Sequence, residues 1–122
     1  LADFIATTWL EAAAAGEHLA PALGLVLAAY VHGGRFFPRH AWGYYALRYL
    51  ADDFAAYLAG LVSDQIAQRV VIHLWHDGTA AALVYAPSAR AVVIQLGTAL
   101  GVGFAPESDA GLCPLGPGFV VT

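Results

Sequence analysis

The stretch RVVIHLWHDG, residues 69–78, decides the fold. Its first eight residues, Arg69–His76, are rich in β-branched side chains, which favours a β-strand. Asp77-Gly78 is a strong signal for a two-residue hairpin turn. We therefore expect an antiparallel sheet in the second half of the chain, with a returning strand over Thr79–Ala86 and a third strand over Arg90–Leu96.

The strand over Arg69–His76 has two faces, because successive side chains of a strand point to opposite sides. One face carries Val70, Ile72 and Leu74, and the other carries Val71, His73 and Trp75. Both faces are largely apolar, whereas an antiparallel sheet with one wet face alternates apolar and polar residues. We therefore predict that this sheet is covered on both sides, by its own helices and by a partner. The alternative is a cover formed by the long C-terminal loop.

The first half of the chain predicts helices. Ala2–Ala15 is rich in alanine, has Asp3 in its first turn where the helix dipole favours an anion, and ends at Gly16. Gly43–Val62 repeats apolar residues at steps of three and four, which marks one face of a helix. Leu19–His32 stays open between a helix and a strand, because its apolar run suits either.

Short irregular segments join and follow these elements. Ser63–Gln68 predicts a turn, and Arg35–Trp42 predicts a loop or a short edge hairpin. The stretch after residue 96 is rich in glycine and proline, so we expect an irregular segment with one strand near Val102. Phe119–Val121 is a candidate final strand.

Length and composition bound the fold and its surroundings. The 122 residues match the usual size of one domain, so we expect a single α+β domain over residues 1–122. Hydrophobic residues make up 60% and charged residues 11% of the chain, against a usual charged share of about 25%. A domain with so few charges leaves apolar surface uncovered, and exposed apolar patches mark interfaces. We therefore predict that a second copy, another protein or lipid covers part of the surface.

Charge and hydropathy argue against two classes of partner. The net charge is −4, lysine does not occur, and the five arginines are scattered, so nothing predicts a nucleic-acid surface. The longest apolar runs fall short of the ~20 residues that span a bilayer, so we expect no transmembrane segment. Cys113 is the single cysteine, which leaves the redox compartment undecided, and the cytoplasm is taken as the default location.

Five histidines raise the question of a metal site. His73 and His76 are three residues apart, which places them on opposite faces of a strand and prevents joint chelation. His32 and His40 flank a loop, yet no cysteine or carboxylate cluster accompanies them in the sequence. The glycines near residue 100 lack the lysine and the spacing of a phosphate loop. We therefore expect neither a metal ion nor a cofactor.

Three short motifs in the first half of the chain occur in the order of a known superfamily. They are Trp9–Glu17, which ends in an alanine-glycine-acid step, Ala28–Phe36, and Gly43–Leu50 with its G-x-x-A-L-R opening. With the Asp77-Gly78 turn they make the stretch Phe4–Tyr85 resemble the nuclear-transport-factor-like superfamily, which includes ketosteroid isomerases and polyketide cyclases. The resemblance implies N-terminal helices packed on a curved antiparallel sheet, a cone-like fold with an apolar cavity, and dimerisation through the sheet. The glycine-rich tail departs from the long final strands of that family.

The resemblance also implies candidate site residues. The isomerases of the family hold a carboxylate base just after the first strand, and His32 stands in that neighbourhood here, where no acid occurs. Histidine titrates near neutral pH, so His32 is the candidate base, with a structural histidine as the alternative. Asp53 is a second catalytic candidate if it faces inward, and otherwise it lies on a solvated helix face. The candidate pocket neighbours are Trp9, Tyr30 and Trp75.

Two functions from different classes follow from these patterns. The first is a domain that binds a small apolar molecule, either as an isomerase-, cyclase- or dehydratase-like enzyme or without catalysis. The rival is a non-catalytic interaction or assembly subunit, whose apolar surface is an interface and whose interior is filled by its own side chains. Under either interpretation we expect a homo-oligomer or a complex with another subunit. A third possibility, a mostly helical domain with a peripheral hairpin, requires that Leu23–His32 is helical and that residues 90–122 add no strands.

Overall fold

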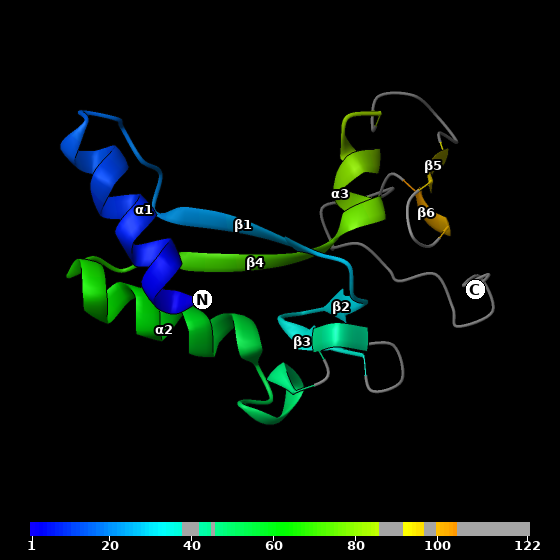
Figure 1. Cartoon of the computed structure of the whole chain (residues 1–122), viewed down its shortest axis with the longest axis horizontal. Helices are drawn as coiled ribbons and strands as arrows, with labels where there is room; N and C mark the ends of the chain where they lie inside the picture. The colour runs from blue at the N-terminus through cyan, green and yellow to red at the C-terminus, as the bar shows by residue number, and fades with distance from the viewer. Residues whose placement is uncertain (38–41, 45, 86–91, 97–99, 105–122) are drawn as a thin grey trace.

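Two parallel strands run through the middle of the structure, with two helices at one end and a hairpin at the other (Figure 1). The structure is a computed structural model and describes residues 1–37, 42–44, 46–85, 92–96 and 100–104 of the 122-residue chain. In chain order its elements are α1 (Ala2–Ala14), β1 (Ala22–Leu27), β2 (Val31–His32), β3 (Arg35–Phe36), the 3₁₀ helices η1 (Trp42–Tyr44) and η2 (Leu47–Tyr49), α2 (Phe54–Ile66), β4 (Val71–His76), α3 (Asp77–Leu83), β5 (Val92–Leu96) and β6 (Leu100–Phe104). The α+β class expected from the sequence is confirmed.

The strand predicted over Arg69–His76 is confirmed as β4, but its partner is not the expected one. β4 pairs in parallel with β1, in a register that joins Ala22 to Val71 and Leu27 to His76. The connection between the two strands contains α2 and is long enough for the crossover that parallel strands require. A strand that is apolar on both faces is typical of parallel pairing, which explains why β4 does not alternate.

The small size of the sheets decides how far the cone-like prediction holds. The described residues form three two-stranded sheets, β1–β4, β2–β3 and β5–β6, and the first of these is parallel. A curved antiparallel sheet covered by the N-terminal helices is therefore not confirmed. The physical reason lies in β4, whose neighbour comes from the first half of the chain rather than from the segment that follows it.

The segment that stayed open in the sequence, Leu19–His32, forms the strands β1 and β2. Gly33 and Gly34, at φ of 54° and 80°, form the turn between β2 and β3, a conformation that glycine adopts easily. Because β1 is a strand, and β5 and β6 follow later in the chain, the mostly helical alternative is wrong. The candidate strand over Phe119–Val121 lies outside the described residues.

The first predicted helix is confirmed as α1, and the second needs correction. α2 begins directly after Asp53, its N-cap, whose carboxylate Oδ1 accepts a hydrogen bond from the backbone N–H of Ala56 at 2.9 Å. The helix predicted over Gly43–Val62 is therefore wrong in its first half, where η1 and η2 lie. The turn predicted over Ser63–Gln68 is also wrong, since α2 continues through most of that segment. The capping acid sets the start of the helix more strongly than the apolar spacing upstream of it.

The hairpin turn expected at Asp77-Gly78 is wrong, because α3 begins there. Asp77 Oδ1 accepts a hydrogen bond from the backbone N–H of Gly78 at 2.6 Å, which supports the first turn of the helix. Three consecutive alanines follow Thr79, and alanine has the highest helix propensity of all residues. The segment Thr79–Ala86, expected as a strand, is therefore helical through Leu83.

The strands predicted over Arg90–Leu96 and near Val102 are confirmed as β5 and β6, which pair as an antiparallel hairpin. α3 contacts both strands of this hairpin. A Cβ atom on Gly103 would overlap the carbonyl oxygen of Gly78. Only glycine therefore lets the backbones of α3 and β6 approach this closely.

The buried core lies between α1, α2 and the β1–β4 pair. It includes Trp9 of α1, Phe54, Leu58 and Val62 of α2, and Ile72 of β4. None of the described residues of α3, β5 and β6 belongs to this cluster. The hairpin end of the molecule thus lies outside this core, and it packs on α3 with a close backbone contact at Gly78 and Gly103.

Candidate functional site

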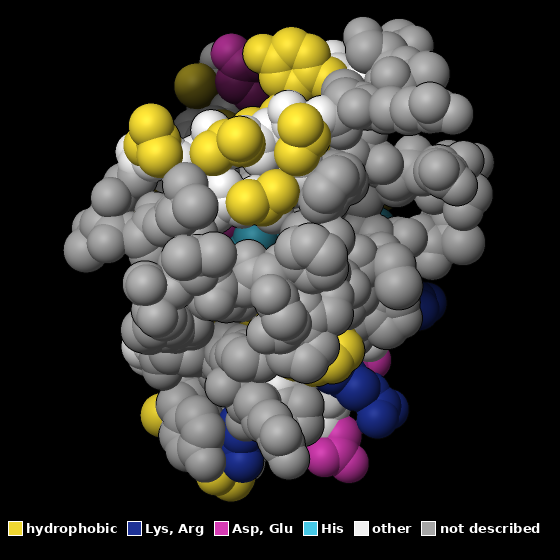
Figure 2. Space-filling view, turned by 90° about the vertical axis from the view of Figure 1, so that its right-hand side faces the viewer, with side chains coloured by type: hydrophobic (Ala, Val, Ile, Leu, Met, Phe, Trp, Pro, Cys, Tyr) yellow, Lys and Arg dark blue, Asp and Glu magenta, His cyan; other side chains and the backbone are white. Residues whose placement is uncertain are grey.

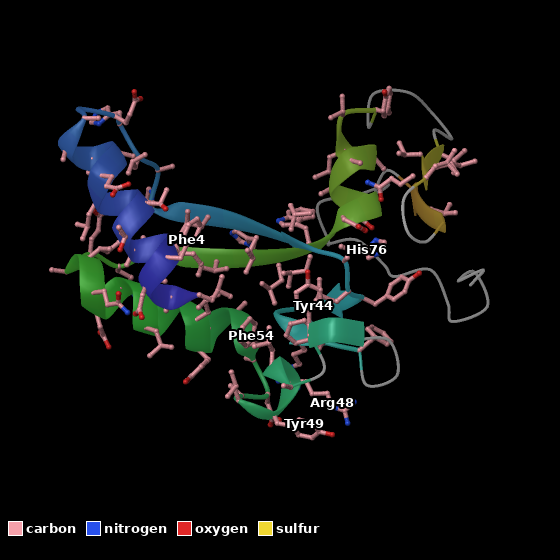
Figure 3. All side chains as sticks on the ribbon, in the orientation of Figure 1. Phe4, Tyr44, Arg48, Tyr49, Phe54 and His76 are labelled. Carbon is pink, nitrogen blue, oxygen red and sulfur yellow. The ribbon has the colours of Figure 1, made fainter. Side chains whose placement is uncertain are left out.

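A cluster of polar side chains lies where β4 ends and α3 begins. His76, the last residue of β4, has extended backbone angles, and the chain turns into α3 directly after it. The ring of Tyr30, from the segment before β2, stacks on the His76 ring with 4.6 Å between centroids and 5° between planes. Figure 3 shows His76 at this end of β4, far from Phe4 of α1. We call Tyr30, His76, Asp77 and Thr79 the junction cluster.

Both ring nitrogens of His76 have polar neighbours. Nε2 lies 3.2 Å from Oδ1 of Asp77, and Nδ1 lies 3.5 Å from Oγ1 of Thr79. A carboxylate accepts hydrogen bonds, so its position assigns the proton of the neutral ring to Nε2. Nδ1 is then the acceptor, and the Thr79 hydroxyl is placed to donate to it. The cluster thus fixes the orientation of the ring through groups on both sides.

The surroundings also set the charge of the cluster at neutral pH. Burial lowers the pKa of His76 below its ordinary value of 6.5, although the negative charge of Asp77 acts in the opposite direction. Burial, and secondly the charge of Asp77, raise the pKa of Tyr30 above 10.0. At neutral pH the cluster therefore presents a neutral imidazole stacked on a protonated phenol. Such a pair is able to accept or donate a proton, or to hydrogen-bond a polar group of a small molecule.

Of the four candidate residues from the sequence whose side chains the structure describes, only Tyr30 lies in this cluster. Trp9 is buried in the core between α1 and α2. Asp53 caps α2. Trp75 precedes His76 on β4, so its side chain points to the opposite side of the sheet. His32 lies in β2, and its side chain is outside what the structure describes. A shared site of these five residues stays a prediction.

Sequence reasoning missed His76, Asp77 and Thr79 as a unit. Their adjacency in the chain is visible in the sequence, but a hairpin turn would have spread them over two strands. The signal that was available is the alanine run after Thr79, which favours a helix. The stack with Tyr30 depends on the parallel register of β1 and β4, which joins Leu27 to His76 and so brings the residues after β1 to the end of β4.

The described part of the chain contains neither a metal-binding cluster nor a membrane-spanning helix. Its histidine, cysteine and acidic side chains form no group of three or more that could hold a metal ion. In these same residues, none of the helices combines the length and the apolarity needed to cross a membrane.

The side of the β1–β4 pair that faces away from α1 and α2 is open. We call it the open sheet face; it consists of Ala22, Gly24, Val26, Val71, His73 and Trp75. Val26 and Val71 are about half exposed there. Parallel sheets normally have both faces covered, so an open apolar face on such a pair is unusual for a chain on its own.

The β5–β6 hairpin has a second open apolar surface. On β5, Val92, Ile94 and Leu96 are 49%, 61% and 86% exposed, while Val93 and Gln95 between them are less exposed. We call Val92, Ile94 and Leu96 the hairpin face. The described residues from Gly78 onward contain no charged side chain. Figure 2 shows hydrophobic side chains gathered at the height of α3, β5 and β6, with charged side chains mainly at the other end of this view.

Searches of protein-family models, of curated proteins and of solved structures found no match to this chain. The assignment of a function therefore rests on the junction cluster and on the two open apolar faces.

Proposed function

We propose that this chain is a non-catalytic interaction or assembly subunit whose apolar surface is covered by another polypeptide. The observation that carries the proposal is the hairpin face, where three large aliphatic side chains in a row lie half to almost fully exposed. The cores of protein interfaces are depleted of charged residues, and the described residues around this face carry no charge.

The energetic argument starts from the exposed aliphatic side chains. Burying one Val, Leu or Ile side chain stabilises a protein by about 1.5–3 kcal/mol relative to leaving it in water. A whole domain is stable by only about 5–15 kcal/mol. Leaving Val92, Ile94 and Leu96 in water thus forgoes a large fraction of the possible stability of a small domain. A partner that covers them recovers that free energy.

The composition and the sheet support the same proposal. Charged residues make up 11% of the chain, which leaves little polar surface to face water. The open sheet face adds a second apolar area, formed by a parallel pair that is covered on one side only. The core between α1, α2 and the β1–β4 pair, by contrast, consists of buried side chains of the chain itself.

The proposal is tested by native mass spectrometry of the protein isolated from its natural source. We expect a complex with at least one further polypeptide and no retained small molecule. In the purified chain, Leu96→Glu should reduce association, because it places a charge in the interface. Thr7→Glu, which adds the same charge to an exposed position of α1, is the matched control and should leave association unchanged. A ligand-free monomer in the native preparation would contradict the proposal.

The junction cluster favours a second candidate function, the binding of a small apolar molecule. Its stacked Tyr30 and His76 rings offer an aromatic surface with few polar groups, which is the usual composition of such sites. The family resemblance implies isomerase-, cyclase- or dehydratase-like chemistry with His32 as the base, and the geometry of the junction cluster offers His76 for the same role. Native mass spectrometry separates the two functions, since this one requires a retained small molecule that is lost in Tyr30→Ala.

A further inference from the structure

We propose that the polypeptide covering the hairpin face is a second copy of this chain, packed face to face across a two-fold axis. The inference rests on the proposed assembly function and names its partner. Ile94, the middle residue of the three, would lie nearest the axis, with Val92 and Leu96 on either side of it.

The charge pattern selects a second copy over a charged partner. Residues 78–85, 92–96 and 100–104 contain no Asp, Glu, Lys, Arg or His. In an isologous contact the same patch of each copy faces its equivalent on the other copy. A patch with charges of one sign would therefore repel its copy, whereas the uncharged hairpin face is self-complementary. A charged partner would lose hydration at the hairpin face without gaining an opposite charge.

The part of the chain that the structure describes leaves one side of the hairpin for a partner. α3 occupies the other side, where the backbones of Gly78 and Gly103 approach so closely that no side chain fits between them. Side chains alternate along β5, so Val92, Ile94 and Leu96 share the free side. Two such sheets pack face to face about 10 Å apart, with their inner side chains interdigitated. A two-stranded sheet is marginal by itself, and a second layer supplies the missing cover.

The small area of the hairpin face sets the expected affinity. Five residues of strand span roughly 16 Å, and two strands lie about 5 Å apart, so the face alone is smaller than the ~800 Å² per partner of a standard interface. We therefore expect a weak dimer that dissociates on dilution.

The test uses opposite charges at Ile94 in the full chain. We expect the wild-type protein to show a monomer–dimer equilibrium in sedimentation equilibrium, and Ile94→Lys and Ile94→Glu each to weaken dimerisation at least tenfold. An equimolar mixture of the two variants should dimerise at least tenfold more tightly than either variant alone, because Lys and Glu then face each other across the axis. Thr7→Lys and Thr7→Glu are the matched control pair on α1. Far-UV circular dichroism checks that each variant keeps its fold.

The outcomes separate this inference from the proposed function. A wild-type dimer that neither Ile94 variant weakens would overturn the hairpin-face dimer, yet the chain would remain an assembly subunit. A purified chain that stays monomeric at all concentrations, together with a hetero-complex in the native preparation, would overturn the second copy as partner and leave the proposed function standing. A monomer in both preparations would overturn both.

Discussion

The β1–β4 pair and the β5–β6 hairpin are both two-stranded and both covered by helices on one side, yet they are held in different ways. Side chains of β1 and β4, such as Leu27 and Ile72, pack into the core with α1 and α2. The hairpin lies on α3 through Gly78 and Gly103, where side chains are absent. One end of the molecule is thus stabilised by buried apolar volume, whereas the other has a close backbone contact that leaves no room for a side chain. The two ends should respond to opposite kinds of substitution.

The largest effect is expected from removing volume at the first end. Phe54 is 2% exposed, and its ring lies 5.2 Å from that of Phe36. Phe54→Ala should lower the free energy of unfolding by about 3–5 kcal/mol, because it leaves a cavity in the core. Urea denaturation followed by circular dichroism measures the loss. Phe4→Ala removes the same ring from a position that is 73% exposed, and should change stability by no more than about 0.5 kcal/mol. Equal losses in both variants would contradict the assigned core.

The second effect comes from adding a single methyl group at the other end. In Gly103→Ala the new Cβ would overlap the carbonyl oxygen of Gly78, so the hairpin must move away from α3. We expect a loss of about 1–3 kcal/mol, the usual range for overpacking. Hydrogen exchange should accelerate in β5 and β6 and stay unchanged in α1 and α2.

The control for this variant lies on the same strand. In Gly101→Ala the new Cβ would meet Oε1 of Gln95 at 3.1 Å, which is the end of a flexible side chain that is able to move. This variant should have a much smaller effect on exchange in β5 and β6. If both variants accelerate exchange equally, the close contact between Gly78 and Gly103 does not hold the hairpin.

A smaller effect is expected at the N-terminus of α2. Asp53→Ala removes the acceptor of the Ala56 backbone N–H and should lower stability by about 1 kcal/mol, the usual contribution of an N-cap. Asp52→Ala, at the exposed neighbouring position, is the control for loss of the same charge. Thermal denaturation followed by circular dichroism distinguishes the two. An equal loss in Asp52→Ala would show that charge, rather than capping, stabilises the helix.

These elements also show how much of the fold the sequence could predict. Local signals identified α1, β4, β5 and β6, because each depends on propensity and spacing within a short segment. The turn at Asp77-Gly78 was wrong because two local signals compete there, and the alanines after Thr79 outweigh the turn. The parallel pairing of β1 with β4 could not be predicted, because the two strands are far apart in the chain. Their pairing depends on how both pack against side chains of α1 and α2.

The candidate site was harder to predict than the fold. Tyr30 was selected from the sequence as an aromatic pocket neighbour, but nothing local indicated that its ring stacks on His76. That contact depends on the strand register, which is a property of the whole fold. The hairpin face, in contrast, follows from the alternation of β5 once its strand is recognised, and the low charge content predicted that some surface of this kind exists.

The smallest predicted effect lies between the two ends, at His76, and it appears as a pH dependence. Burial places the pKa of folded His76 below the value of 6.5 that the ring has in an unfolded chain. Between these two pKa values the unfolded state binds more protons than the folded state, so stability rises with pH through this window and falls as the pH is lowered from 6.5. Asp77 opposes the effect of burial, which keeps the slope small.

The variant His76→Gln isolates this slope. It removes the titrating ring, so the urea midpoint should depend less on pH between about pH 5 and 7 than in the wild type. The loss of the Tyr30 stack lowers the midpoint by a similar amount at every pH, and the slope is therefore the informative quantity rather than the level. His73→Gln, at an exposed position on the open sheet face, is the matched control substitution. If His76→Gln keeps the wild-type slope, burial in the junction cluster does not lower the pKa of His76.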